Sequence, residues 1–453
     1  MANFAQQLSH ASRRDFLRTS ACIVGGTGLV IAGNPAAYAA ADDTIKVALI
    51  GCGARGAGAA LQALSTAGPV KLWAMADAFQ DRLDFCLRNL QRGLTASYDR
   101  EASRGMGEQA NVPKERQFVG LDAYRQAIDS GVDVVLLIEP PGFRPKHFEY
   151  AVRSGKHVFM EKPVATDAAG VRRVLAAAEE AKKKGLKIGV GLQRHHHPSY
   201  QEAIPRIRDG EIGPVRLLRC YWNGGPPAKT PMPRGDKTEL EHQVRNWYFF
   251  SWLSGDHICE QHVHNLDVCN WIKQTHPVEA QGMGGRQVRV GKEYGDIFDH
   301  HAVEFAYADG TRMYSQCRQM RGCTARVMEV AHGEKGVAEL GARATIKLDG
   351  KPLIRLGRQT AAASPYQQEH DVLFDAIRND RPHNEAEYGA LSTMTAIMGR
   401  LATYSGNVIR WDEAMRSDIR LTTDAEQWDA EPPVLPNEEG EYPVAVPGVT
   451  KVL

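Results

Sequence analysis

The chain has 453 residues, of which 43% are hydrophobic, so it is long enough to build two domains with sizeable cores. Its 55 Lys and Arg residues nearly balance its 54 Asp and Glu residues, and the formal net charge is +1. Such a balance excludes the strongly basic face that a nucleic-acid or anionic-membrane partner would require, so neither partner is predicted.

The N-terminal segment, residues 1–40, predicts an export signal. Arg13 and Arg14 precede a short, glycine-rich apolar run over residues 21–32, and Ala37-Tyr38-Ala39 offers a small-residue cleavage site. The run is too short to span a bilayer core of about 30 Å, which argues against a membrane anchor. This order of regions is typical of a twin-arginine signal, which exports folded proteins, and it predicts a periplasmic location.

The cysteine pattern adds a second expectation about the compartment. The chain has 8 cysteines, one of them in the leader, and none form a C-x-x-C pair, so neither a zinc ribbon nor a thioredoxin-like motif is indicated. Because the twin-arginine route follows folding in the reducing cytoplasm, a disulfide framework is not expected. Mainly free, buried thiols are predicted.

Short apolar runs alternate with helical stretches in the first part of the chain, residues 41–165. The predicted strands are Ile45–Ile50, Lys71–Ala76, Val132–Ile138 and His157–Met160. The predicted helices are Ala54–Leu64, Phe79–Leu90, Leu121–Asp129 and Phe148–Ser154, with Gln91–Pro113 as an inserted surface loop. Strands without polar alternation are buried on both faces, as in a parallel sheet, so this part predicts a doubly wound α/β Rossmann domain.

A different rhythm follows over residues 166–425. A helix at Ala168–Lys184 and a strand at Leu186–Val190 lead into two hairpins, which turn at Asp309-Gly310 and Asp349-Gly350. These hairpins predict a second α/β domain with a large open, mostly antiparallel sheet. Two helices are expected next, and residues 426–453 are predicted to form a proline-rich tail along the surface. The predicted helices are Gln367–Ile377 and Glu385–Tyr404.

A glycine-rich turn follows the first predicted strand and opens a helix. Gly51 permits the tight turn, Gly53 lets the backbone approach a pyrophosphate, and Gly56 lets the helix pack closely. Asp77 stands at the end of the second strand, where an acid would hold the adenosine ribose hydroxyls and repel a ribose phosphate. The pattern therefore favours NAD over NADP, although Asp77 could instead cap the following helix.

The segment Glu161-Lys162-Pro163 ends a buried parallel strand. Ligands of such sheets bind in the crevice outside the carboxyl ends of the strands, so the Lys162 ammonium is placed to orient a hydroxyl and favour a developing alkoxide. The alternative is an exposed lysine after a strand, with Glu161 as its partner.

A histidine-rich segment forms the third motif. If it is one helix, His257, Glu260, His264 and Asp267 share a face, at spacings of three, four and three. A histidine beside a carboxylate is a competent general base. The set could bind a metal with further histidines, or form a core network; no metal is predicted, since no zincin-type motif is present. The further histidines are His262, His300 and His301, with Asp299 beside them.

Together these motifs resemble the Gfo/Idh/MocA oxidoreductases, the glucose-fructose oxidoreductase and inositol dehydrogenase superfamily. The resemblance rests on the glycine turn, Pro140 after a buried strand, Glu161-Lys162-Pro163, Gln193-Arg194 and the segment from His264 to Asp267. It implies that Lys162 and His264 are catalytic, that the bond before Pro163 is cis, and that the open sheet often forms an oligomer interface, so a homo-oligomer is expected.

The segment also departs from the family. Glu260 stands where the family usually has Asp, and His262 replaces a small residue. Glu139 and the loop Pro140–Pro145 differ from the common turn, which predicts a remodelled substrate pocket.

The resulting hypothesis is an NAD-dependent oxidoreductase that oxidises a secondary hydroxyl of a sugar, polyol or glycoside. The alternatives are a redox-neutral glycosidase or lyase with tightly bound NAD, and a non-catalytic nucleotide-binding protein. The predicted catalytic residues are Lys162, His264 and Glu260, with Glu260 or Asp267 orienting the histidine. The predicted cofactor-binding residues are Gly51, Gly53, Ala54, Arg55, Gly56, Asp77, Pro140, Glu161 and Lys162. The predicted substrate-binding residues are Arg194, His257, Asp267 and Trp247.

Overall fold

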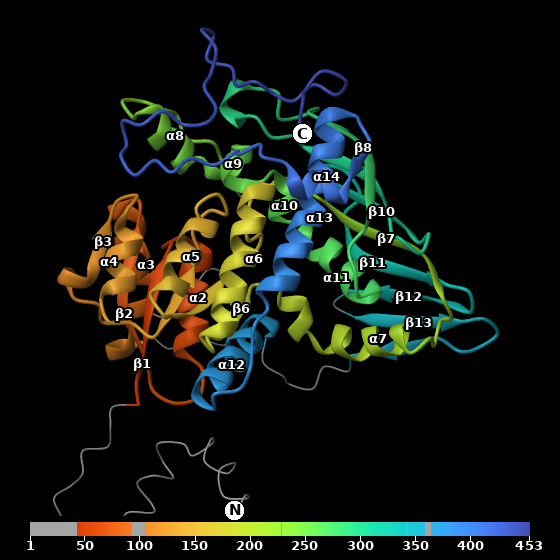
Figure 1. The fold of residues 1–453 in the computed structure, drawn as a ribbon, viewed down its shortest axis with the longest axis horizontal. Helices are drawn as coiled ribbons and strands as arrows, with labels where there is room; N and C mark the ends of the chain where they lie inside the picture. The colour runs from red at the N-terminus through yellow and green to blue at the C-terminus, as the bar shows by residue number, and fades with distance from the viewer. Residues whose placement is uncertain (1–42, 93–105, 228, 342, 358–363) are drawn as a thin grey trace, which may run out of the picture. The chain divides into compact units, whose positions relative to one another are not determined.

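Two β-sheets organise the structure, a computed structural model that describes residues 43–92, 106–227, 229–341, 343–357 and 364–453 (Figure 1). Residues 44–453 form one unit. The predicted export signal and part of the predicted Gln91–Pro113 loop lie outside the described residues. No described helix combines the length and apolarity needed to cross a membrane. The seven cysteines of the described part are free and six of them are buried, which confirms the prediction of buried thiols.

The first sheet is parallel and has six strands in the order β3-β2-β1-β4-β5-β6. The order runs outward in both directions from β1 and β4, so the topological switch point lies between these two strands. β1 and β5 have the predicted bounds, whereas β3 was not predicted. The strands are β1 (Ile45–Ile50), β2 (Val70–Asp77), β3 (Gln117–Val119), β4 (Val134–Leu137), β5 (His157–Met160) and β6 (Ile188–Val190).

Helices cover both faces of this sheet, as expected for a Rossmann fold. α2 has the predicted bounds, and α5 begins before the predicted Phe148 because Pro145 fits the first helical turn, where no N–H partner is needed. Since β6 belongs to the sheet, the sheet extends past the predicted domain boundary at residue 165. The helices are α2 (Ala54–Leu64), α3 (Gln80–Arg92), α4 (Ala123–Asp129), α5 (Arg144–Arg153) and α6 (Ala168–Lys183).

The second sheet has nine strands in the order β14-β13-β12-β11-β7-β10-β9-β8-β15. Its β7–β10 pair is parallel and the other pairs are antiparallel, so the prediction of a large, mostly antiparallel sheet is confirmed. Both predicted hairpins are present as β9–β10 and β13–β14. The strands are β7 (Val215–Gly224), β8 (Glu279–Gly285), β9 (His300–Ala306), β10 (Arg312–Gln319), β11 (Arg326–Gly333), β12 (Gly336–Leu340), β13 (Ala344–Leu348), β14 (Ile354–Leu356) and β15 (Ile409–Arg410).

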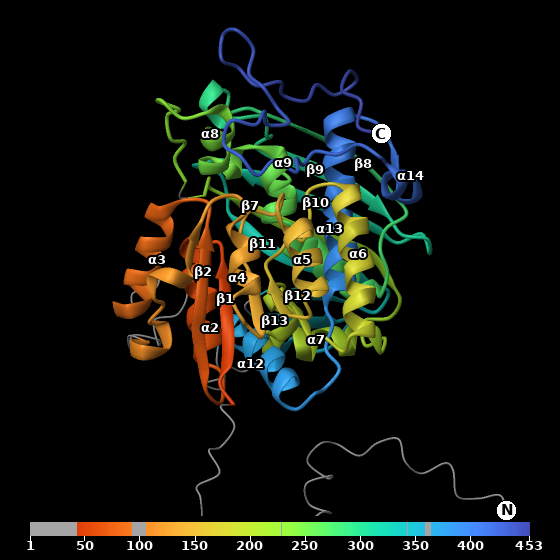
Figure 2. The ribbon, with the colours of Figure 1, turned by 60° about the vertical axis from the view of Figure 1, so that its left-hand side comes forward.

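One face of the nine-stranded sheet is covered by helices and the other is open (Figure 2). α13 lies between this sheet and α6 and is buried almost all round, and its sequence accordingly has no continuous charged face. On the open face, β10 exposes alternate residues, including Tyr314. The covering helices are α7 (Pro198–Arg208), α11 (Val263–Lys273) and α13 (Ala386–Ser405), and α12 (Pro365–Arg378) packs on α2.

The C-terminal tail crosses from the first domain to α8 at one end of the molecule (Figure 1). Trp428 stacks on Phe79, with ring centroids 5.2 Å apart, and Glu426 pairs with Arg125 at 2.6 Å. Gln243 of α8 donates a hydrogen bond to the Val434 carbonyl at 2.6 Å. Because Phe79 follows Asp77, the tail lies beside the carboxyl end of β2. The short helices here and beyond are α8 (Glu239–Arg245), α9 (Ser251–Ser254), α10 (His257–Glu260) and α14 (Trp411–Arg416).

Candidate active site

The glycine turn between β1 and α2 has the geometry that a dinucleotide requires. Gly51 has φ +94°, and a Cβ there would lie 2.5 Å from the backbone nitrogen of Glu139. A Cβ at Gly56 would lie 2.0 Å from the Gly51 carbonyl oxygen, whereas a Cβ at Gly53 would meet no heavy atom within 4 Å. The turn is therefore closed on its protein side and open at Gly53, where a pyrophosphate would approach the backbone.

Asp77 lies at the same edge of the sheet, half-buried at the end of β2. Its Oδ2 accepts a hydrogen bond from the Cys52 amide at 2.6 Å, and its Oδ1 accepts one from the Phe79 amide at 2.9 Å. Burial raises the pKa of this carboxyl and the two backbone N–H groups oppose that effect. Asp77 thus supports both the glycine turn and the start of α3, and its oxygens retain lone pairs for a ribose hydroxyl.

Arg55, the second residue of α2, is held by other side chains. Its guanidinium pairs with Glu161 at 2.6 Å and with Glu369 at 3.1 Å, and it donates to Gln62 at 2.8 Å. Burial acts to raise the pKa of Glu161, but Arg55 and Lys162 outweigh it and lower that pKa. Arg55 and Glu161 consequently tie α2 to the end of β5 and α12, a supporting arrangement rather than a free phosphate ligand.

Lys162 follows β5, and the peptide bond between it and Pro163 is cis, in agreement with the resemblance. Its Nζ donates to the Glu260 carbonyl oxygen at 2.5 Å and lies 3.4 Å from Glu260 Oε1. The side chains of Lys162 and Glu260 are only 14% and 17% exposed. Glu260 therefore joins the first domain to α10 by holding the lysine that faces the crevice.

His264 lies in the first turn of α11. Its Nδ1 is buried without a partner, and its ring stacks on Trp222 with centroids 6.0 Å apart. Burial, followed by the charges of Lys162 and Arg194, lowers its pKa well below the ordinary histidine value. The predicted orientation of His264 by Glu260 or Asp267 is wrong, since Glu260 contacts Lys162 and Asp267 accepts from Ser392 and pairs with His195, both at 2.8 Å.

The expectation of one continuous helix face through this segment is also wrong. α10 ends at Glu260 and α11 begins at Val263, so the four predicted residues do not lie along one helix. His257 is completely buried, with Nδ1 2.9 Å from Asp256. Neither His257 nor Asp267, which is 2% exposed, offers surface to a substrate.

The two other predicted substrate residues lie nearer the crevice. Arg194 forms a buried ion pair with Glu329, and its guanidinium lies 5.9 Å from the Trp222 ring that stacks on His264. Trp247 is half-buried, and the Lys229 ammonium lies 3.7 Å from its ring centroid. Trp222, Lys229 and Tyr248 are therefore neighbours of the site. For the two aromatic residues, the sequence offers a signal, because each stands in a pair of adjacent aromatic residues, Tyr221-Trp222 and Trp247-Tyr248.

One group of described residues could hold a metal ion, namely Asp256, His257 and His301, whose ligand atoms lie within 4.8 Å of one another. Asp256 also accepts hydrogen bonds from the Phe298 amide at 2.8 Å and the Tyr404 hydroxyl at 2.6 Å. The two histidines lower the pKa of Asp256 well below its usual value. These contacts describe a histidine-rich core network, one of the alternatives that the sequence left open.

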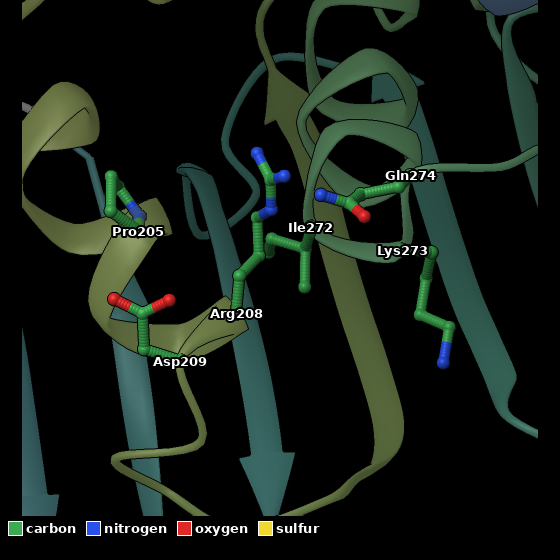
Figure 3. Close-up of a pocket in the computed structure, with 6 residues that line it drawn as sticks. All are labelled: Pro205, Arg208, Asp209, Ile272, Lys273 and Gln274. Atoms are coloured by element: carbon green, nitrogen blue, oxygen red, sulfur yellow. The ribbon is translucent and has the colours of Figure 1, made fainter.

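A separate surface cavity of about 470 Å³ lies between the C-terminal ends of α7 and α11 (Figure 3). It contains none of the predicted site residues, and Lys273 at its edge is engaged with Asp309 at 2.6 Å. Arg208 and Gln274 reach toward one another across it. The lining residues are Pro205, Arg208, Asp209, Ile272, Lys273 and Gln274.

A parallel sheet with an open glycine turn at its switch point, beside a lysine and a neutral histidine, defines a dinucleotide-dependent oxidoreductase. The chain belongs to the Gfo/Idh/MocA family. Residues 45–191 match the family described as "Oxidoreductase family, NAD-binding Rossmann fold", and residues 200–339 match the "GFO/IDH/MocA C-terminal domain". NAD is therefore the cofactor, as the sequence predicts.

Relatives and solved structures agree with this assignment. The chain is 26% identical over 263 residues to an inositol 2-dehydrogenase of Pseudomonas fluorescens, covering 56% of this chain and 70% of that protein. Its fold is similar to aldose-aldose oxidoreductase of Caulobacter crescentus, with a TM-score of 0.62, 20% identity and coverage of 81% and 99%. It is also similar to scyllo-inositol dehydrogenase of Lactobacillus casei with bound NAD(H) and scyllo-inositol, with a TM-score of 0.59, 20% identity and coverage of 82% and 99%.

Proposed function

We propose that this protein oxidises a secondary hydroxyl group of a sugar, polyol or glycoside by hydride transfer to NAD. The observation that carries the proposal is the meeting of Lys162, Glu260 and His264 at the carboxyl edge of the Rossmann sheet. The similarity to an inositol 2-dehydrogenase and to an aldose-aldose oxidoreductase supports a polyhydroxylated substrate.

The cofactor would be held by the glycine turn, by Asp77 at the ribose and by the loop that begins at Pro140. When bound, NAD supplies a hydride acceptor for the carbinol carbon. The open side of Gly53 and the lone pairs left on Asp77 fit this group. Glu161 and Arg55 support the turn from behind.

His264 removes the hydroxyl proton in this proposal. Its Nδ1 is enclosed, so Nε2 is the nitrogen that a substrate hydroxyl can reach, and the lowered pKa keeps the ring in the neutral form that accepts a proton. The Lys162 ammonium steadies the substrate oxygen as negative charge develops on it. Glu260 positions that ammonium through the contact between the two side chains.

A second candidate, a redox-neutral glycosidase or lyase with permanently bound NAD, is favoured by the tail. Trp428 and Glu426 fasten the tail beside the ribose end of the site, where it would hinder release of a nucleotide. A periplasmic location, proposed from Arg13 and Arg14, would also favour retention because free NAD is scarce outside the cytoplasm.

The experiment analyses purified full-length protein for bound nucleotide and then offers it sugars, polyols and aryl glycosides. Oxidised product formed together with reduced nicotinamide supports the dehydrogenase. Release of aglycone without net reduction supports the redox-neutral route. Nucleotide binding without either reaction across the panel would overturn both and leave a non-catalytic binding protein.

The variant Lys162→Met tests the role of the lysine in the reaction. Its control is Lys156→Met, which removes a lysine that donates to the Val132 carbonyl.

A further inference from the structure

Arg144 is a completely buried arginine at the point where two loops of the site meet. It is 2% exposed, begins α5, and donates from Nη1 to the Pro163 carbonyl and from Nη2 to the Glu139 carbonyl. The first carbonyl follows the catalytic lysine candidate and the second follows β4. Arg144 therefore ties together the segments that follow β4 and β5, at the carboxyl edge of the sheet where nucleotides of such folds bind.

The guanidinium is not neutralised by an acid in direct contact. Its hydrogen-bond acceptors in the described structure are the two carbonyl oxygens, and its Nε is buried without a partner. The nearest acids, Glu139, Glu161 and Glu260, act on it only through space. Two neighbouring cations of the site are paired, since Lys162 contacts Glu260 and Arg55 contacts Glu161, while the Lys229 ammonium lies against the Trp247 ring. Arg144 thus carries a buried positive charge without an ion-pair partner in the described structure, between the segments that follow β4 and β5.

We propose that this charge favours the reduced form of the bound nicotinamide. The oxidised ring carries a positive charge and the reduced ring is neutral, so a fixed cation nearby destabilises only the oxidised form. An arginine is suited to this purpose because its guanidinium remains protonated even when buried. The effect would draw hydride from the substrate and keep the reduced cofactor on the protein, and it rests on the proposed function.

The test measures the relative affinity of the full-length protein for NADH and NAD⁺. The protein is equilibrated with known mixtures of both nucleotides, freed of unbound nucleotide and denatured, and the released nucleotides are quantified. Arg144→Gln should lower the NADH preference about ten- to twentyfold, which is the effect expected if one charge lies about 10 Å from the ring in a medium with an effective dielectric constant near 20. Arg144→Lys, which keeps the charge, should stay within about threefold of the wild type.

Arg400 provides a matched control. It is also 2% exposed and donates to two carbonyls, Gly255 at 3.0 Å and Thr166 at 2.8 Å, but it lies in α13 away from the strand ends. Arg400→Gln should leave the nucleotide preference unchanged. If Arg144→Gln does not fold, Glu139→Gln tests the same charge effect in the opposite direction, since loss of that acid should raise the NADH preference.

Two results would overturn the inference: an unchanged preference in Arg144→Gln, or an equal change in Arg400→Gln. If Glu139→Gln stands in for the first variant, an unchanged preference there overturns it too. Failure of the wild type to bind either nucleotide is a different result, because it would refute the proposed function itself.

Discussion

The glycine turn permits a substitution pair that separates cofactor binding from folding. Gly53 has φ −74°, an ordinary value for an L-residue, and a Cβ there meets no heavy atom within 4 Å. Gly53→Ala should therefore change the free energy of unfolding by only about 0.5 kcal/mol. Gly56→Ala places a Cβ 2.0 Å from the Gly51 carbonyl oxygen, and such an overlap with backbone should cost about 1–3 kcal/mol or more.

Gly53→Ala should nevertheless weaken NAD binding, although it barely changes the stability of the fold. Its open side is the surface that a pyrophosphate must approach, and a methyl group there holds the anionic oxygens away from the backbone N–H groups of α2. Loss of one hydrogen bond to a charged group is worth about 1.5–3 kcal/mol, so the dissociation constant for NAD should rise about ten- to hundredfold.

The assay combines urea unfolding with nucleotide titration for both variants. Gly53→Ala should unfold like the wild type and bind NAD weakly, whereas Gly56→Ala should be the less stable of the two. Wild-type affinity for NAD in Gly53→Ala would refute the assignment of this turn as the pyrophosphate site, because the added methyl group would project into the space that the pyrophosphate must occupy.

The remaining predictions concern catalysis, cofactor choice and pH. Lys162→Met and His264→Ala should each lower the turnover rate by about 10² to 10⁴ with nearly unchanged unfolding curves, and wild-type turnover in either would remove that residue from the mechanism. Asp77→Ala should weaken NAD binding and narrow its advantage over NADP in parallel titrations; unchanged affinity for both would assign Asp77 to the turn alone. Burial, followed by the charge of Arg55, lowers the pKa of His370 to about 3, below the unfolded value of about 6.5. Between the two pKa values, only the unfolded chain takes up this proton, so the free energy of unfolding falls as the pH falls below about 6.5. From pH 7 to pH 5, the wild type should therefore lose about 2 kcal/mol more of its unfolding free energy than His370→Gln. Equal losses in urea unfolding would contradict the lowered pKa of His370.

The sequence predicted the first domain well because its signals are local. β1 is apolar at every position but Lys46 and is buried on both faces, and α2 begins directly after the glycine turn, so both have their predicted bounds. The Asp-Gly turns placed two hairpins of the second sheet for the same reason. β7, at the centre of that sheet, is bounded by Gly213-Pro214 and Gly225-Pro226, but it pairs with strands far along the chain, so these local signals do not identify its place in the sheet.

The histidine segment shows where periodicity is insufficient. Spacings of three and four residues predict one face only if the helix is continuous. Here the helix is interrupted between Glu260 and Val263. Asp256, just before α10, has φ +68°, and its carboxylate accepts bonds from the His257 side chain and the Tyr404 hydroxyl, which turns this end of the segment into the core.

The break separates two roles that the sequence had combined. Glu260, at the end of α10, reaches the lysine of the first domain, while His264, in the first turn after the break, forms no hydrogen bond with a carboxylate of the described residues and has a buried Nδ1 without a partner. A histidine paired with an acid would hold its proton more firmly; an unpaired, buried one beside cations stays neutral. The Glu260 side chain contacts Lys162 instead. The ion pair of this site therefore joins Lys162 to Glu260 across the domain boundary. A Glu260→Gln variant should disturb the position of the Lys162 ammonium more than it disturbs His264.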